Sequence, residues 1–149
     1  SYPESKLTIV GKGPLKEALV KEANALKISE SISWIMSLNR DEIVRQMDSC
    51  HVVVSSSKLE TFGLTIAESG ARGKPVVVTD SGGVSDIVTA KTGLIVSQNS
   101  DSLADGLISI QKNYSEYNKE EIRSVIMERF TEEFIYNQLM NCYSQRVEV

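Results

Sequence analysis

The chain has only two cysteines and fewer basic than acidic residues. The first feature argues against a disulfide framework or a cysteine metal site, and the second against a nucleic-acid-binding role. Its two cysteines, Cys50 and Cys142, stand far apart and match no metal-binding or redox spacing. Both fall on apolar helix patterns, so we expect buried free thiols in a reducing compartment rather than a disulfide. The formal net charge of −4 gives no support to a nucleic-acid partner or a polybasic membrane contact.

Long hydrophobic runs are also missing. The sequence contains no stretch of about 18 apolar residues, so we expect no membrane-spanning helix. With 149 residues, 41% of them hydrophobic, the chain can bury a sizeable core. Repeats and low-complexity segments are absent. We therefore expect one globular domain over residues 1–149.

Short apolar segments alternate with helical patterns along most of the chain. Near-continuous apolar strands between helices are typical of a parallel sheet covered on both faces. The sequence therefore predicts an α/β fold, a Rossmann-like three-layer αβα arrangement with a helical C-terminal tail. The expected strands are residues 7–10, 32–36, 51–55, 75–79 and 93–96.

Helix-start signals predict where the helices lie. Expected starts are Pro14, the capping box at 39–42, Leu64, the Gly82-Gly83 turn, Ser100 or Asp101, Asn118 and Thr131. Apolar spacing predicts the buried faces of two of these helices. They are Leu15, Ala18, Leu19, Ala23 and Leu26 in the first helix, and Ile135, Leu139 and Cys142 in the last.

Two glutamates, Glu60 and Glu68, flank a glycine turn after the third expected strand. One lies in the loop and the other about one turn into the next helix. Backbone N–H groups at a helix start lack intrahelical partners and favour anions. Carboxylates accept hydrogen bonds from sugar hydroxyls. Because ligands bind at the carboxyl ends of parallel strands, this loop predicts a site for a phosphate joined to a sugar.

Several ordered segments resemble one known family. The segments are Val52-Val53-Val54-Ser55-Ser56, Glu60-Thr61-Phe62-Gly63-Leu64, Glu68, residues 71–78, Gly82-Gly83 and residues 92–96, with Gly11-Lys12-Gly13-Pro14 ahead of them. They resemble the nucleotide-binding half of retaining GT-B glycosyltransferases of family 4. The resemblance covers roughly residues 6 to 96, and the helical tail agrees in kind. It implies transfer of a hexosyl group from a nucleoside diphosphate sugar to a saccharide or lipid-linked acceptor.

The resemblance also implies a longer enzyme. In that family this C-terminal lobe binds the donor, and an N-terminal lobe holds most of the acceptor. Members begin the lobe with a strand and helix ahead of the position of Leu7, about 30 residues on the usual scale. That strand is central in the sheet, and the unit carries an Arg and a Lys that neutralise the diphosphate. We expect the 149 residues to be a fragment that lacks this unit and is inactive alone.

The family's roles carry over to the glutamate loop. Glu68 stands where a glutamate accepts hydrogen bonds from the ribose hydroxyls, and Glu60 where one faces the transferred sugar. Phe62, Gly63 and Leu64 would bind phosphate or sugar through backbone N–H groups, with the Thr65 hydroxyl beside them. The alternatives are a solvated helix glutamate at 68, a capping glutamate at 60 and a core side chain at 62.

Four glycines complete the expected donor site. Gly11 and Gly13 would border the nucleotide, and Lys16 stands where a dinucleotide fingerprint has its third glycine, which weakens an NAD interpretation. Gly82 and Gly83 would let the backbone approach the donor sugar, or form a simple turn. Family members usually have glycine at the position of Thr61, so the backbone there is expected to differ.

The resemblance implies a metal-independent reaction. No Asp-x-Asp occurs, so the metal-bridged diphosphate of the other large glycosyltransferase fold has no ligands. We expect no metal and no cofactor beyond the nucleotide sugar, and a cytoplasmic location. The resemblance implies polysaccharide or glycolipid assembly, which would place the full enzyme at the cytoplasmic membrane face as a peripheral protein. Two alternatives stay open: a nucleotide-sugar epimerase or phosphorylase of the same fold, and a non-catalytic nucleotide-sugar-binding module.

Overall fold

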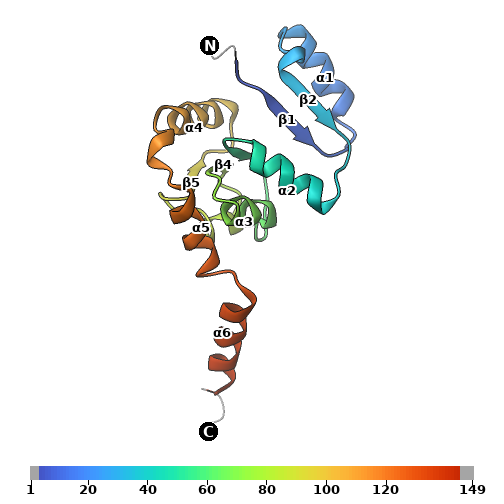
Figure 1. Ribbon diagram of the computed structural model, residues 1–149. Helices are drawn as coiled ribbons and strands as arrows, with labels where there is room; N and C mark the ends of the chain where they lie inside the picture. The colour runs from blue at the N-terminus through green and yellow to red at the C-terminus, as the bar shows by residue number, and fades with distance from the viewer. Residues whose placement is uncertain (1–3, 145–149) are drawn as a thin grey trace. The chain divides into compact units, whose positions relative to one another are not determined.

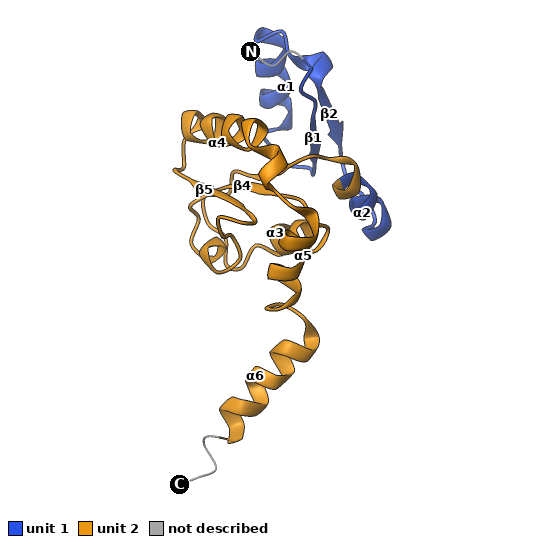
Figure 2. Cartoon of the chain, turned by 60° about the vertical axis from the view of Figure 1, so that its left-hand side comes forward, with its two compact units in different colours: residues 1–46 blue, residues 47–149 orange. Residues whose placement is uncertain are grey.

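The computed structural model describes residues 4–144 (Figure 1). The chain forms two compact units, Ser1–Gln46 and Met47–Val149, which are coloured separately in Figure 2. Each unit is described by itself below. The expected single domain over residues 1–149 stays a prediction.

Unit 1 pairs two strands in parallel and packs a helix beside them. It holds β1 (Leu7–Val10), α1 (Lys16–Ala25), the 3-10 turn η1 (Ser29–Ser31), β2 (Ile32–Ile35) and most of α2 (Arg40–Ser49). Leu7 lies opposite Ile32 and Val10 opposite Ile35. Both strands are confirmed, whereas α1 begins after Leu15 rather than at Pro14.

The predicted capping box of α2 is confirmed. The Asn39 amide donates to Glu42 Oε2 at 2.8 Å, and the Glu42 amide donates to Asn39 Oδ1 at 2.9 Å. This exchange satisfies two backbone donors that a helix start would otherwise leave unpaired.

Unit 1 buries little of its apolar surface. Among its described residues only Ala23 is buried, at 4% exposed. Leu15 is 68% exposed and Leu26 is 62% exposed, and β1 is largely exposed as well. The predicted buried face of the first helix is therefore confirmed only at Ala23 and wrong at Leu15, Ala18, Leu19 and Leu26, and the predicted burial of β1 is wrong. One helix on two strands offers too little area to cover the apolar side chains that they contribute.

Unit 2 contains a three-stranded parallel sheet in the order β3-β4-β5. Val54 lies opposite Val77, which lies opposite Leu94. Parallel pairing is confirmed, but in residues 4–144 the hydrogen bonds form two separate sheets. The elements of unit 2 are β3 (Val53–Ser55), α3 (Leu64–Ala71), β4 (Val76–Thr79), η2 (Gly83–Asp86), β5 (Gly93–Val96), α4 (Ser100–Lys112), η3 (Tyr114–Glu116), α5 (Lys119–Met127) and α6 (Glu132–Ser144).

The strand β4 lies at the centre of the core of unit 2. Every residue of β4 is buried. Val76 and Val78 pack in the cluster that holds Ile66 of α3 and Ile126 of α5. Val77 faces α4, where a Cβ on Gly106 would lie 2.9 Å from its Cγ1. Helices thus cover both faces of the sheet, as Figure 2 shows for α3 and α4, and the three-layer prediction is confirmed for this unit.

Asparagines begin two helices of unit 2. The Asn118 side chain accepts from the amides of Glu120 and Glu121, as predicted. The N-cap of α4 is Asn99, which accepts from the Ser102 amide, so the predicted cap at Ser100 or Asp101 is wrong by one or two positions. Asparagine is a strong N-cap residue because its side chain reaches the free amides of the first turn.

The last helix, α6, leaves its predicted inward face exposed. Ile135 is 46% exposed, Leu139 is 53% exposed, and Cys142 is exposed and free. In Figure 1, α6 extends away from the sheet of its own unit. The spacing identified an apolar stripe correctly, but among residues 4–144 no core lies against it, so the predicted burial of Cys142 is wrong.

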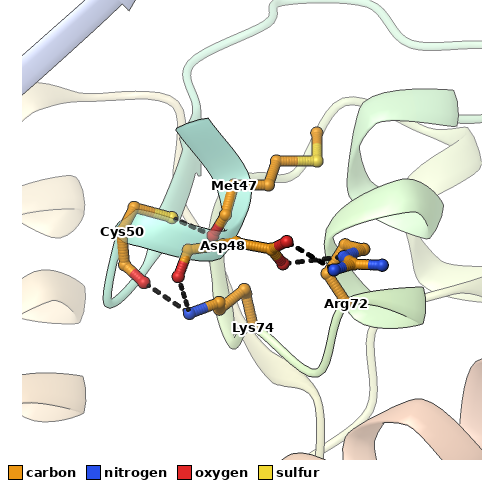
Figure 3. A network of polar contacts seen from close by, with 5 residues as sticks. All are labelled: Met47, Asp48, Cys50, Arg72 and Lys74. Carbon is orange, nitrogen blue, oxygen red and sulfur yellow. Dashed lines mark hydrogen bonds and ion pairs between the residues drawn. The ribbon is translucent and has the colours of Figure 1, made fainter. Parts of the chain in front are cut away.

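The other cysteine takes part in a polar network at the end of α2 (Figure 3). Lys74 Nζ donates to the carbonyls of Asp48 and Cys50, each at 2.8 Å, and Arg72 forms an ion pair with the Asp48 carboxylate. Cys50 lies after the helix, is half-buried, and donates from Sγ to the Met47 carbonyl. Burial raises the pKa of the Cys50 thiol, and the Arg72 guanidinium lowers the pKa of the Asp48 carboxyl. This network joins residues 48–50 to the segment between α3 and β4.

We predict that Ile126→Ala destabilises the 149-residue chain by about 2–5 kcal/mol, because it opens a cavity in the cluster beside β4. The matched control is Ile135→Ala, which removes the same atoms from an exposed position and is expected to change stability by less than about 0.5 kcal/mol. Urea unfolding followed by circular dichroism measures both. Equal losses in the two variants would contradict the core described here.

Candidate functional site

The candidate site in unit 2 is built on the loop between β3 and α3. The loop runs from the last residue of β3, Ser55, to Gly63, the N-cap of α3. It contains Glu60 and Phe62, while Leu64, Thr65 and Glu68 lie on α3. The structure therefore brings the predicted residues of the glutamate loop to the carboxyl end of a parallel strand.

Helix α3 begins at a glycine that has no side chain to cap it. Gly63 has a left-handed φ of 93°, which glycine adopts without a steric penalty. The first amides to bond inside the helix are those of Ile66 and Ala67, and both donate to the Gly63 carbonyl. The amides of Leu64 and Thr65 precede these bonds. They can therefore donate to an anion at the helix start.

Glu60 is held through its backbone. Its amide donates to the Ser81 carbonyl at 2.8 Å, and its carbonyl accepts from the Gly83 amide at 2.9 Å. These bonds form a parallel bridge between Glu60 and Gly82, so the loop after β3 is joined to the loop after β4. The side chain of Glu60 is half-buried.

Glu68 is exposed and takes its position from α3. Within residues 4–144, neither the Glu68 nor the Glu60 carboxylate forms a hydrogen bond or salt bridge with another side chain or backbone group. Their oxygens are thus available to accept hydrogen bonds from hydroxyl groups of a ligand. The capping alternative for Glu60 has no support, because its carboxylate makes no bond to an amide of α3.

Gly83 is required by the fold of the loops themselves. A Cβ at this position would lie 2.1 Å from the Thr61 carbonyl oxygen and 2.9 Å from the Phe62 amide nitrogen. No side chain fits there, because both neighbours are backbone. The side of Gly83 on which a Cβ would stand is therefore filled by the backbone of Thr61 and Phe62. In the same turn, Gly82 has a positive φ of 99°.

Phe62 contributes its ring to packing. The ring meets Phe130 edge to face, with centroids 5.5 Å apart, and Phe130 packs against the core cluster of unit 2. Such pairs stabilise through their ring quadrupoles as well as through burial. Phe62 is still 40% exposed, so this contact anchors the loop without removing it from the surface.

Sequence reasoning missed two residues that fasten the loop. Thr79, the last residue of β4, donates from its hydroxyl to the Ser57 carbonyl at 2.6 Å. The amide of Gln98, which follows β5, donates to the carbonyls of Lys58 and Asp80. The position of Thr79 in the sequence could have indicated this role. It is the one polar residue of β4, and it stands at the carboxyl end of the strand, where the candidate loop lies.

Gly11 and Gly13 lie in unit 1, immediately after β1. The Gly11 amide donates to the Ile35 carbonyl at 2.9 Å, which closes the turn onto the end of β2. An open hollow of about 300 Å³ lies beside this turn. Its lining includes Ile9, Leu19 and Trp34 together with Lys12 and Lys16.

In residues 4–144 no group of three or more His, Cys, Asp or Glu side chains is arranged to hold a metal ion. In the same range no helix has the length and apolar character needed to cross a bilayer.

The chain is similar to known glycosyltransferases in sequence. It is 26% identical over 149 residues to an uncharacterized glycosyltransferase of Methanocaldococcus jannaschii, covering 97% of this chain and 38% of that protein. It is 30% identical over 107 residues to the GDP-mannose-dependent alpha-(1-6)-phosphatidylinositol dimannoside mannosyltransferase of Mycobacterium tuberculosis, covering 72% of this chain and 27% of that protein. The chain thus spans well under half the length of these relatives.

Solved structures share the fold. The Anabaena protein HepE in complex with UDP matches with a TM-score of 0.85 at 21% identity, covering 96% of this chain and 42% of that chain. The lipopolysaccharide outer core galactosyltransferase WaaB in its apo form matches with a TM-score of 0.84 at 20% identity, covering 97% of this chain and 43% of that chain. These likenesses establish the α/β fold of GT-B glycosyltransferases, with its helical C-terminal tail.

Residues 1–124 match the family of glycosyl transferases group 1, a range that includes every predicted site residue. Because the match covers most of the chain, this protein belongs to the glycosyl transferases group 1 family.

Proposed function

We propose that the chain is the donor-binding part of a retaining glycosyltransferase of family 4. The complete enzyme moves a hexosyl group from a nucleoside diphosphate sugar to a saccharide or lipid-linked acceptor. The main support for the proposal is the start of α3. Its first amides, those of Leu64 and Thr65, make no hydrogen bond within the helix, and they lie in sequence between Glu60 and Glu68. Neither glutamate carboxylate is bonded to another group within residues 4–144. Family membership supports glycosyl transfer as the chemistry.

Each part of the loop has a proposed task. The amides of Leu64 and Thr65 bind the diphosphate, whose charge the helix start favours. Glu68 accepts hydrogen bonds from the ribose hydroxyls, and Glu60 faces the transferred sugar. The backbone bridge to Gly82 supports this role, because it fixes where the Glu60 side chain leaves the loop.

The reaction proceeds by electrostatic stabilisation. As the bond between the sugar and the diphosphate breaks, negative charge grows on the leaving group and positive charge grows on the sugar ring. Oriented amides stabilise the first, and the Glu60 carboxylate stabilises the second. We propose that no metal ion and no cofactor besides the nucleotide sugar take part. An Arg and a Lys outside these 149 residues are proposed to complete the diphosphate site.

The proposed setting is the assembly of a polysaccharide or glycolipid in the cytoplasm. HepE is known in complex with UDP-glucose, and the mycobacterial relative is named for phosphatidylinositol dimannoside. A lipid-linked acceptor would bring the complete enzyme to the inner face of the cytoplasmic membrane as a peripheral protein.

We predict that the two glutamates separate binding from transfer in the full-length enzyme. Glu60→Ala should lower the transfer rate by about 100- to 1,000-fold while nucleotide affinity is retained, because its charge acts on the transition state. Glu68→Ala should weaken nucleotide affinity by about 10- to 100-fold, because it loses charge-assisted hydrogen bonds. Initial-rate kinetics and calorimetric titration of the nucleotide measure the two effects.

The matched control is Glu120→Ala at an exposed glutamate near the start of α5, which should change neither quantity. Unchanged transfer in Glu60→Ala would favour a non-catalytic binding module over an enzyme. Loss of nucleotide affinity in Glu60→Ala with no effect in Glu68→Ala would reverse the assigned roles.

We predict that the purified 149-residue chain transfers no sugar, because the proposed acceptor lobe and basic pair lie outside it. A radiolabelled donor assay with the chain alone, run beside the full-length enzyme, measures this. Transfer by the chain alone above the no-enzyme background would refute the prediction.

Titration of the full-length enzyme with UDP, GDP and ADP identifies the base. UDP and GDP are the first candidates, since HepE binds UDP and the mycobacterial relative depends on GDP-mannose. The nucleoside diphosphate that binds at least tenfold more tightly than the other two then selects the donor sugars to assay.

A further inference from the structure

The strand β3 leaves the sheet before the candidate loop reaches Glu60. The ladder between β3 and β4 ends where Ser55 lies opposite Val78. Residues 56–59 then run to Glu60 without a strand partner, and the next backbone pairing is the bridge between Glu60 and Gly82. A flexible segment of this length would leave Glu60 poorly placed unless other groups hold it.

The hydroxyl of Thr79 holds this segment at its start. Thr79 is 4% exposed and follows Val78 in β4. Its Oγ1 lies 2.6 Å from the Ser57 carbonyl oxygen and 3.5 Å from that of Ser55. A hydroxyl has one proton to donate, so the Ser57 carbonyl is the acceptor. The side chain thus continues the ladder for two residues after the backbone pairing of β3 has ended.

A second donor holds the same segment from the surface side. Gln98 Nε2 lies 3.0 Å from the Lys58 carbonyl and also reaches the Asp80 carbonyl. The two acceptors belong to the loops after β3 and β4, so one amide group joins both. Neighbouring carbonyls at 57 and 58 are therefore each bound by a side chain from a different strand end.

We infer that Thr79, with Gln98 in support, is a positioning residue that sets the place of Glu60. This inference rests on the function proposed for Glu60. Thr79 contacts the backbone of the loop and no reacting group. It acts through the segment 57–59, whose far end is fixed by the Glu60 amide on the Ser81 carbonyl. Glu68 takes its position from α3, so its task does not depend on this hydrogen bond.

The test compares Thr79→Val with Thr79→Ser in the full-length enzyme. Valine keeps the shape of threonine and removes the donor, whereas serine keeps the donor. We expect Thr79→Val to lower kcat for sugar transfer by about 10- to 100-fold, as a displaced reacting group does, with nucleotide affinity unchanged. Thr79→Ser should retain most of kcat. Hydrogen exchange at the Glu60 amide should become roughly fivefold faster in Thr79→Val alone, because one hydrogen bond is lost.

Several outcomes would overturn the inference. It fails if Thr79→Val keeps both its kcat and its Glu60 exchange rate, or if the valine and serine variants lose kcat and nucleotide affinity alike. If Thr79→Val does not fold, Gln98→Met serves as the second variant, because it removes the surface donor at similar size. Unchanged kcat and exchange in Gln98→Met would then overturn the inference.

The readouts also distinguish this inference from the proposed function. If Glu60→Ala leaves transfer unchanged, the role of Glu60 fails, whatever Thr79 does. Faster exchange at the Glu60 amide in Thr79→Val would still support Thr79 as the group that fixes the loop.

Discussion

The burial of β4 on both faces is the constraint on which the candidate site depends. Val76 and Val78 pack toward α3 and α5, and Val77 packs toward α4, so the strand cannot shift without exposing apolar surface on one side. Its register then fixes β3 and β5, and its last residue fixes the loop that follows β3. The placement of Glu60 is thus a consequence of core packing several residues away from it.

The two units differ in how many of their apolar side chains they bury. Unit 2 has a sheet covered by helices on both faces, whereas unit 1 has two parallel strands and one buried apolar residue among those described. Parallel sheets are stable when both faces are covered. Among its described residues unit 1 lacks such cover, and Leu7 and Val10 of β1 and Leu15 and Leu26 beside α1 stay exposed.

Local sequence signals predicted the helices and strands, whereas burial and the contacts of the loops depend on residues far apart in the sequence. Apolar runs located the strands, and Asn39 and Asn118 located two helix starts, because these signals act over a few residues. An apolar stripe says which face is apolar but not whether a partner covers it, which is why Leu15 and Cys142 were wrongly expected to be buried. The glutamate loop was likewise readable from its spacing. The contacts that hold it were not, since they join residues 22 and 40 positions apart.

Different parts of unit 2 position the two glutamates. Glu68 belongs to a helix that packs on the core, so its position follows that of the helix start and of any phosphate bound there. Glu60 belongs to a loop fixed by hydrogen bonds to residues beyond β4 and β5. A change in those bonds can move Glu60 without moving the helix. Under the proposed function, this separation would let nucleotide binding stay tight while the position of Glu60 relative to the donor sugar is adjusted. Under the same proposal, substitutions in the loops after β4 and β5 would act on Glu60 through the hydrogen bonds that hold its loop, even where they do not touch the donor sugar.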